Sequence, residues 1–230
     1  MIGAVVPAHD EEALIGRALQ ALRVAAAHPD LHGEEVRILV VLDACRDRTA
    51  EIACELGAQC LAVEARNVGF ARAAGAQALI EQGARWLAFT DADSVVSPSW
   101  FSRQLALRTE AVCGVVEVDD WTGFTAEERI AYERGYTDAE GHRHIHGANL
   151  GVSVSAYQQA GGFPPLRSRE DVGLVERLCA LGLRIAWTNT VRVVTSARQD
   201  ARAPHGFAAH LGALRCASCA ADGTGMRVAA

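Results

Sequence analysis

The first part of the chain alternates short apolar runs with segments in which apolar residues recur every three or four positions. We expect strands over the apolar runs at 4–7, 37–44, 60–63 and 86–90. Helices are expected between them: apolar residues recur at helical spacing from Leu14 to Leu22, and again over 49–56 and 68–79. Because strand and helix alternate in this order, the strands are predicted to pair in parallel through right-handed crossovers, as in a doubly wound sheet.

Residues that start and stop helices support two of these boundaries. Asp47 is expected to cap the helix over 49–56, which Gly57 ends. Asn67 is expected to cap the following helix, which Gly83 ends.

The pattern loosens after Pro98. We expect a strand over 111–118, a long polar surface excursion over 119–146, and a strand over 147–155. An amphipathic helix is predicted over 169–183, with Val172, Val175, Leu178 and Leu181 facing inward. Short strands over 184–187 and 191–196 and a helical segment over 206–217 complete the pattern. Since no stretch is rich enough in Pro, Gly or Ser to act as a linker, a single α/β domain is expected over 1–230.

Composition excludes several classes of function. The 230 residues carry a net charge of −6, and no basic run is present, so nucleic-acid binding is not expected. All 22 basic residues are arginine, which indicates a GC-rich, bacterial coding sequence. No apolar stretch approaches the ~20 residues that span a bilayer, and no signal peptide opens the chain. We therefore expect a cytoplasmic protein, either free or peripheral to the inner face of the membrane.

Cysteine and histidine offer two weaker metal hypotheses. The seven cysteines are expected to be free, buried thiols. Cys216 and Cys219 form a CxxC pair near His205 and His210, which could be half of a metal site, but a frayed tail is the plainer interpretation. The alternating histidines of the excursion could bind zinc, although a solvated polar segment explains them as well; they are His142, His144 and His146.

Acidic residues follow three of the four early strands. His9, Asp10 and Glu11 follow the first, Asp43 the second, and Asp91 and Asp93 the fourth. In an open parallel sheet, ligands bind beyond the carboxyl ends of the strands. Asp91 and Asp93 alternate, so in an extended segment they point to the same side and could hold Mg²⁺ or Mn²⁺ with positions left for phosphate oxygens. The alternative is an ordinary acidic turn.

Two further features leave alternatives open. Glu170 and Asp171 begin a predicted helix, where they either interact with the helix dipole or supply a general base. Arg72 lies about one turn after Asn67, and is either an exposed helical arginine or a cation that approaches a nucleotide and its phosphates.

Taken in order, these segments resemble the family 2 glycosyltransferases of the GT-A fold over roughly residues 2–190. The similarity is carried by VVPAHDEEALIGRALQAL, VVLDACRDRTAEIA, NVGFARAAGAQ, FTDADSVVSPSWF, HGANLGVSVSAYQQAGGF and REDVGLVERL. The resemblance implies a Rossmann-like domain with a mostly parallel sheet flanked by helices. It also implies that 1–118 is the half that binds the nucleotide sugar and 119–205 the acceptor-side half, followed by a C-terminal helix and flexible tail over 206–230.

The resemblance implies an inverting, metal-dependent transfer of one sugar from a UDP- or GDP-sugar to a hydroxyl of a small-molecule, lipid or glycan acceptor. Asp171 would be the catalytic base and Glu170 a supporting group. Donor contacts would come from Pro7, His9, Glu11, Asp43, Arg72, Asp91 and Ala92. Mn²⁺ or Mg²⁺ would be bound by Asp93, the stronger candidate, and Asp91, which could serve the ribose instead. A late residue, His205 or Arg198, would complete the metal or phosphate contacts.

Departures from the family pattern bear on the type of reaction. The arginine pair that many members carry in the acceptor-side strand is absent from GVSVSAYQQ, and no Q-x-x-R-W motif of processive synthases follows Glu170 and Asp171, so a single transfer is expected. Two alternatives are a sugar-1-phosphate nucleotidyltransferase and a non-catalytic nucleotide-sugar-binding protein. The first usually has a Gly-rich basic loop after its first strand, whereas this chain has PAHDEE there.

Overall fold

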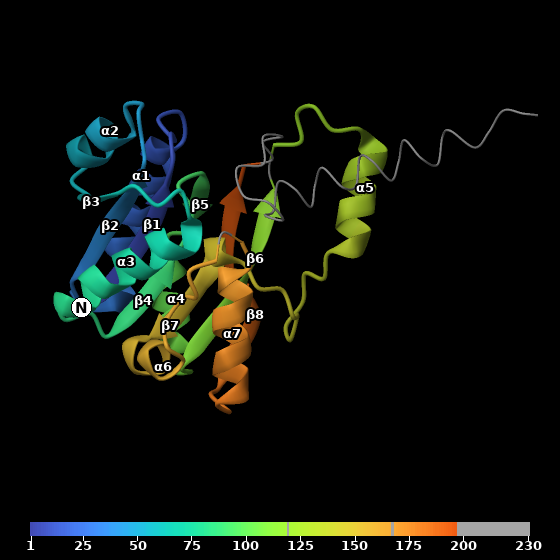
Figure 1. Cartoon of the computed structure of the whole chain (residues 1–230). Coiled ribbons are helices and arrows are strands. Elements are labelled where there is room, and N and C mark those ends of the chain that lie inside the picture. Colours follow the sequence, from blue (N-terminus) through green and yellow to red (C-terminus); the bar gives the residue numbers. More distant parts are fainter. Residues whose placement is uncertain (119, 167, 197–230) are drawn as a thin grey trace, which may run out of the picture.

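The computed structural model describes residues 1–118, 120–166 and 168–196, which form one mixed sheet of eight strands with helices on both faces (Figure 1). The strand order is β3-β2-β1-β4-β7-β6-β8-β5. The strands are β1 (Ile2–Ala8), β2 (Val36–Asp43), β3 (Gln59–Val63), β4 (Trp86–Phe89), β5 (Ser94–Val96), β6 (Ala111–Val118), β7 (Leu150–Ser153) and β8 (Ile185–Thr195). The helices are α1 (Ile15–Ala26), α2 (Thr49–Glu55), α3 (Val68–Glu81), α4 (Trp100–Ala106), α5 (Ala126–Gly135), α6 (Val154–Gln159) and α7 (Glu170–Ala180), with 3-10 turns η1 (Pro29–Leu31) and η2 (Gly147–Asn149).

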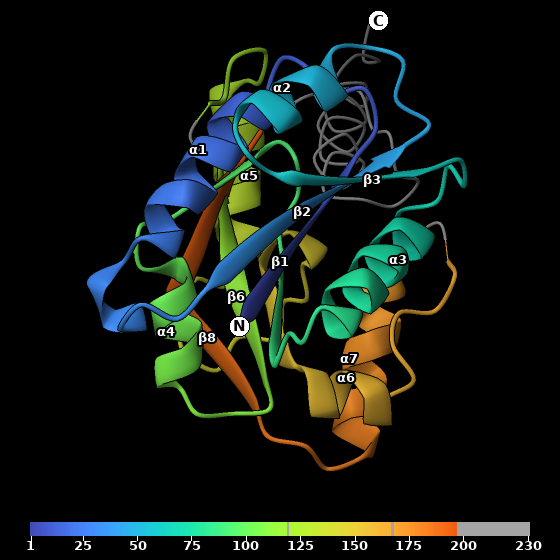
Figure 2. The ribbon, with the colours of Figure 1, turned by 90° about the vertical axis from the view of Figure 1, so that its left-hand side faces the viewer.

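The first four strands pair in parallel, which confirms the doubly wound prediction. β1 lies between β2 and β4, and β3 pairs with the outer side of β2. Alternate residues of β1 supply the two cores: Val6 packs on the face covered by α1, α2 and α4, and Val5 on the face covered by α3, α6 and α7 (Figure 2). A Cβ added at Gly75 would lie 2.6 Å from Val5, so this glycine lets α3 lie directly on the sheet.

Several elements after β4 depart from the sequence prediction. Only 150–153 of the expected strand over 147–155 is a strand, because the Ser153 hydroxyl accepts a hydrogen bond from the Ala156 amide and starts α6. The runs at 184–187 and 191–196 form one strand, β8, whose pairing with β6 shifts at an irregularity after Cys113. β5 and α4 were not predicted.

The predicted excursion contains a helix. Thr125 and Glu128 form a capping box that starts α5, a pattern that the sequence analysis missed. Figure 1 shows α5 to one side of the sheet, where Tyr132 packs with Val118 and neighbouring aromatic side chains.

Three smaller predictions have mixed outcomes. Asn67 caps α3 through a hydrogen bond from the Phe70 amide to its side chain, as predicted. Asp47, by contrast, precedes the N-cap residue of α2, which is Arg48. In α7, Leu174, Val175 and Leu178 are buried, but the helix ends at Ala180 and leaves Leu181 51% exposed. No helix of the described residues is both long and apolar enough to span a bilayer.

Candidate functional site

The predicted site residues gather at the carboxyl ends of β1, β2 and β4. The chain places β2 and β3 on one side of β1 and then returns to place β4 on its other side. Strand order therefore reverses between β1 and β4, the position at which open α/β sheets bind ligands. The amino-terminal residues of α3 and α7 reach the same edge through Arg72 and Glu170, which are hydrogen-bonded to each other.

The loops after β1 and β2 are tied together by backbone hydrogen bonds. The Arg46 amide donates to Oδ1 of Asp10 over 2.6 Å, and the Glu12 amide donates to Oδ2 of Asp47 over 2.9 Å. The Glu11 amide donates to the Thr49 hydroxyl over 2.8 Å. These bonds fix one wall of the site before any ligand binds.

Pro7, His9 and Glu11 lie in this wall, each in a different setting. Pro7 is a half-buried residue of β1 that pairs with Val41 of β2. His9 Nδ1 lies 2.6 Å from the Asp43 carbonyl oxygen, and since a carbonyl can only accept, Nδ1 carries the proton. Glu11 is buried, and its carbonyl oxygen accepts from the amides of Leu14, the N-cap residue of α1, and Ile15, its first residue.

Asp43 orders the loop that leads into α3. Its Oδ1 accepts hydrogen bonds from the amides of Ala65 and Arg66, and its Oδ2 accepts from the amide of Asn67, all over 2.8 Å. The side chain is almost fully buried. The structure thus gives Asp43 a loop-positioning role, and the contact to a nucleotide base stays a prediction.

Arg72 is a buried bridge rather than an exposed helical arginine. It is 4% exposed; Nη1 donates to Oε1 of Glu170, and Nη2 donates to Oδ1 of Asp91 over 2.5 Å. A Cβ at Gly147 would overlap the guanidinium, so only glycine fits there. Burial lowers the pKa of Arg72, but Asp91, Glu170 and Asp171 outweigh it and raise that pKa, so the arginine is always charged.

The two acids of the Glu-Asp pair have different environments. Glu170 is 3% exposed, and burial raises its pKa while Arg72 opposes that shift. Asp171 is only partly buried; its Oδ2 accepts from the Gly147 amide over 2.7 Å and its Oδ1 from the Val172 amide over 2.8 Å. Glu170 is therefore committed to a cation, while Asp171 is oriented by two backbone N–H groups.

The Asp91–Asp93 segment leaves the end of β4 beside the end of β8. The Asp91 side chain is 37% exposed, Ala92 is buried, and Asp93 is partly exposed. Oδ1 of Asp93 lies 3.4 Å from the hydroxyl oxygens of both Ser94 and Thr195. Across residues 1–118, 120–166 and 168–196, no group of three or more His, Cys, Asp or Glu side chains could hold a metal ion. His205, His210, Arg198, Cys216 and Cys219 lie outside the described residues.

The zinc hypothesis for the three excursion histidines is wrong. The rings of His142, His144 and His146 stack, with centroids 5.4 and 5.8 Å apart in sequence order, and Tyr136 stacks on His144 at 4.1 Å. His142 Nδ1 and His144 Nε2 instead accept backbone amide hydrogens, the second from Thr137. A zinc site needs ring nitrogens that converge on one point, whereas these stacked rings turn their faces to one another.

Gly147 and Thr49 are site residues that the sequence analysis missed. Gly147 packs on the Arg72 guanidinium and donates its amide to Asp171, and Thr49 accepts from the Glu11 amide. The segment containing Gly147 was recognised, but nothing in the sequence shows that it packs against Arg72.

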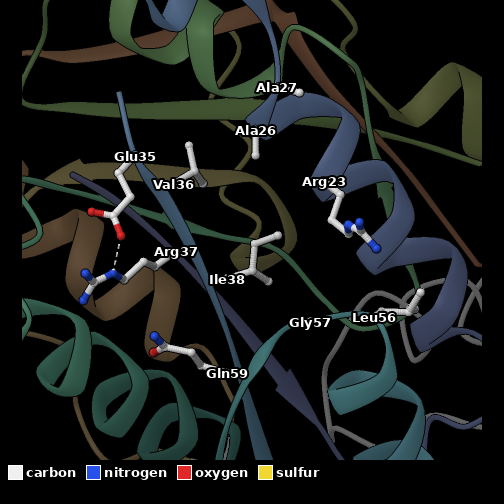
Figure 3. Close-up of a pocket in the computed structure, with 10 residues that line it drawn as sticks. All are labelled: Arg23, Ala26, Ala27, Glu35, Val36, Arg37, Ile38, Leu56, Gly57 and Gln59. Carbon is white, nitrogen blue, oxygen red and sulfur yellow. Dashed lines mark hydrogen bonds and ion pairs between the residues drawn. The ribbon is translucent and has the colours of Figure 1, made fainter. Parts of the chain in front are cut away.

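A separate hollow lies at the opposite end of the sheet (Figure 3). Its volume is about 490 Å³, and its lining includes Arg23 of α1, Val36 and Ile38 of β2, and Leu56 after α2. Since Val36 is the first residue of β2, this hollow is remote from the carboxyl ends of the strands.

Comparisons with known proteins identify the family and the fold. The family model described as Glycosyl transferase family 2 matches residues 4–159, more than half of the chain. No curated protein matches the sequence.

Three solved structures share the fold. S. aureus TarS 1-349 in complex with UDP has a TM-score of 0.65 at 15% identity, over 86% of this chain and 61% of that chain. Mannosyltransferase PcManGT from Pyrobaculum calidifontis, in complex with GDP-Man and Mn²⁺, has a TM-score of 0.62 at 18% identity, over 98% and 76%. Glucosyl-3-phosphoglycerate synthase from Mycobacterium tuberculosis, in complex with Mn²⁺, UDP and glucosyl-3-phosphoglycerate, has a TM-score of 0.63 at 20% identity, over 93% and 75%. The chain thus spans less than two thirds of the TarS structure.

Proposed function

The chain belongs to glycosyl transferase family 2, and from this premise we propose that it transfers one sugar from a nucleoside-diphosphate sugar to an acceptor hydroxyl, with inversion. The observation that carries the proposal is the difference in contacts between the two acids at the start of α7. Glu170 is committed to Arg72, whereas Asp171 is partly exposed and held by backbone N–H groups. Such a pair suits one positioning group and one general base.

The donor is proposed to be a UDP- or GDP-sugar. The three similar structures contain UDP or GDP-Man, which supports this class of donor without selecting a sugar. We place the donor at the edge formed by Pro7, His9, Asp43 and Asp91. Arg72 would act there mainly through Asp91, since both of its terminal nitrogens are already bonded to carboxylates.

The carboxylates of Asp93 and Asp91 suit a hard divalent cation. They are partly exposed oxygen donors at the carboxyl end of a strand, and two carboxylates leave coordination positions for phosphate oxygens. Mn²⁺ or Mg²⁺ would be held by Asp93, with Asp91 beside it, and two similar structures contain Mn²⁺. When bound, the metal would offset the negative charge of the diphosphate leaving group.

Asp171 is proposed to accept the proton of the acceptor hydroxyl as that oxygen attacks the anomeric carbon. The Gly147 amide fixes Oδ2 of Asp171, so the carboxylate does not need to reorganise during the reaction. The acceptor is a small molecule, a lipid or a glycan. A single transfer is proposed because the Q-x-x-R-W pattern at 82–86 lies at the amino end of β4, remote from the carboxyl ends of the strands, and none follows Asp171.

The experiment measures sugar transfer and donor binding together. A thermal-shift panel of nucleotide sugars, with and without Mn²⁺, should identify a donor that raises the melting temperature by mass action. With that donor, Asp171→Asn should retain binding but lose roughly 10²- to 10⁴-fold in turnover, the usual contribution of a general base.

Glu176→Gln, an exposed acid on the same helix, is the matched control and should behave as wild type. Wild-type turnover in Asp171→Asn would exclude Asp171 as the base. Formation of a nucleotide sugar from a sugar 1-phosphate and a nucleoside triphosphate would favour the nucleotidyltransferase instead. Donor binding without turnover against any acceptor would favour the non-catalytic alternative.

A further inference from the structure

Two exposed thiols lie side by side where α2 is followed by β3. The Sγ atoms of Cys54 in α2 and Cys60 in β3 are 3.5 Å apart, and both residues are exposed. The prediction of buried thiols is therefore wrong for this pair and for Cys179, which is also exposed, although Cys113 is buried.

The backbone holds this pair together independently of the thiols. The Gly57 amide donates to the Cys54 carbonyl over 3.0 Å, and the Ala58 amide donates to the Ala53 carbonyl over 3.1 Å. With Gly57 at φ +76°, these bonds form a Schellman motif, which fixes the path of the chain out of α2.

The other end of the connection is fixed as well. Cys60 lies opposite Val40 in the parallel pairing of β3 with β2. Both cysteines are thus anchored in regular structure, and a disulfide, in which the sulfurs are ~2 Å apart, requires only small side-chain rotations.

We propose that Cys54 and Cys60 form a reversible redox site, oxidised by peroxide to an intramolecular disulfide and reduced again by small-molecule thiols. The Cys54 thiolate attacks one peroxide oxygen, the O–O bond breaks, and the products are a Cys54 sulfenic acid and hydroxide, which is protonated to water. The Cys60 sulfur then attacks the Cys54 sulfur, and the sulfenic hydroxyl leaves with the Cys60 proton as a second water. Two thiols and one peroxide thus give one disulfide and two waters.

The surroundings of the pair set the order of these steps. Partial burial and the adjacent Cys54 thiol raise the pKa of Cys60 to about 11. Cys60 is then protonated near neutral pH, and because the thiolate is the nucleophile, the first attack belongs to Cys54 and the resolving step to Cys60.

The sequence offers a direct readout with an internal control. Trypsin cleavage after Arg48 and Arg66 releases a peptide that contains Cys54 and Cys60 and no other cysteine. Cleavage after Arg177 and Arg184 releases a second peptide, whose single cysteine is the exposed Cys179. The chain of residues 1–230 carries Cys216→Ser and Cys219→Ser, which remove the second closely spaced pair of cysteines. It is treated with hydrogen peroxide, alkylated without reduction and digested, and the peptides are analysed by mass spectrometry.

After peroxide, the mass of peptide 49–66 should be lower by two hydrogen atoms, and the peptide should not be alkylated. Reduction with dithiothreitol should make both cysteines available for alkylation again. Cys179 should not form an intramolecular disulfide. In Cys60→Ser, Cys54 should instead accumulate a sulfenic acid that dimedone traps, because its resolving partner is gone. The proposal is overturned if peptide 49–66 stays fully alkylated after peroxide treatment while Cys179 is oxidised. It is also overturned if Cys54 gives the same oxidation products in Cys60→Ser as in the chain that retains Cys60.

Discussion

Replacement of Arg72 by methionine tests how strongly the two halves of the site depend on one buried cation. Arg72 is 4% exposed and its partner Glu170 is 3% exposed, so Arg72→Met leaves a carboxylate buried without its counter-ion. Breaking a buried pair in this way typically costs about 3–5 kcal/mol, a large share of the roughly 5–15 kcal/mol that stabilises a domain. We expect a loss of that size in the free energy of unfolding measured by urea titration.

The cost should depend on pH with a defined sign. Burial raises the pKa of Glu170 above its ordinary value of 4.5, and Arg72 opposes that shift. In Arg72→Met the opposition is lost, so the folded-state pKa lies further above the unfolded value. A group whose pKa is raised in the folded state stabilises the fold while it is protonated, so for Glu170 this stabilisation is fully present below pH 4.5. It disappears as the pH rises through the folded-state pKa. The deficit should therefore be smallest in acid and should grow toward neutral pH.

Two comparisons separate charge burial from lost packing. The double variant Arg72→Met/Glu170→Gln removes the stranded charge and should be more stable than Arg72→Met alone. Arg85→Met breaks an ion pair with Glu34, but the Arg85 side chain is 56% exposed, so the loss should be about 1 kcal/mol or less. The reasoning is refuted if Arg72→Met costs no more than Arg85→Met, or if the double variant is as unstable as Arg72→Met. If Arg72→Met does not fold, Arg72→Lys replaces it in the comparison. Lysine retains the charge but loses the two-pronged guanidinium, so its loss in the free energy of unfolding should lie between those expected for Arg85→Met and Arg72→Met.

Three other expectations are open to test. Asp93→Asn should abolish Mn²⁺-dependent binding of a nucleoside diphosphate in calorimetry, and unchanged affinity would exclude Asp93 from the metal site. Gly147→Ala should lower stability and turnover because its methyl group overlaps Arg72, whereas Gly135→Ala, with nothing within 4 Å of the new atom, should be nearly neutral. Burial raises the pKa of Asp47, but its hydrogen bonds outweigh this effect and lower the pKa below the ordinary value of 3.8. Asp47 should therefore stabilise the fold above pH 3.8, and urea titrations at lower pH should show this stabilisation disappearing. In Asp47→Asn this part of the pH dependence should be missing.

The sequence by itself determined the parallel strands β1 to β4 and the edge at which the candidate site residues gather. Continuous apolar runs mark β1, β2 and β4, because strands buried on both faces have no polar side. The acids that follow these runs come to one edge because parallel strands end at the same edge. Asn67 could be assigned as a cap because its hydrogen bond joins residues three apart, a contact visible in the local sequence. Local elements that carry little pattern, such as β5 with three residues, were missed.

Only the tertiary structure decided what each acid does. Arg72 and Glu170 lie 98 positions apart, and their ion pair depends on how α3 and α7 pack, which no local pattern encodes. The same holds for Asp171, whose orientation comes from the Gly147 amide. Cys54 and Cys60 are exposed neighbours although both lie in apolar segments, because β3 is an edge strand whose residues are all exposed or half-buried. Periodicity reports which residues face a core, but the partner that a buried charge or an exposed thiol meets depends on contacts between distant elements.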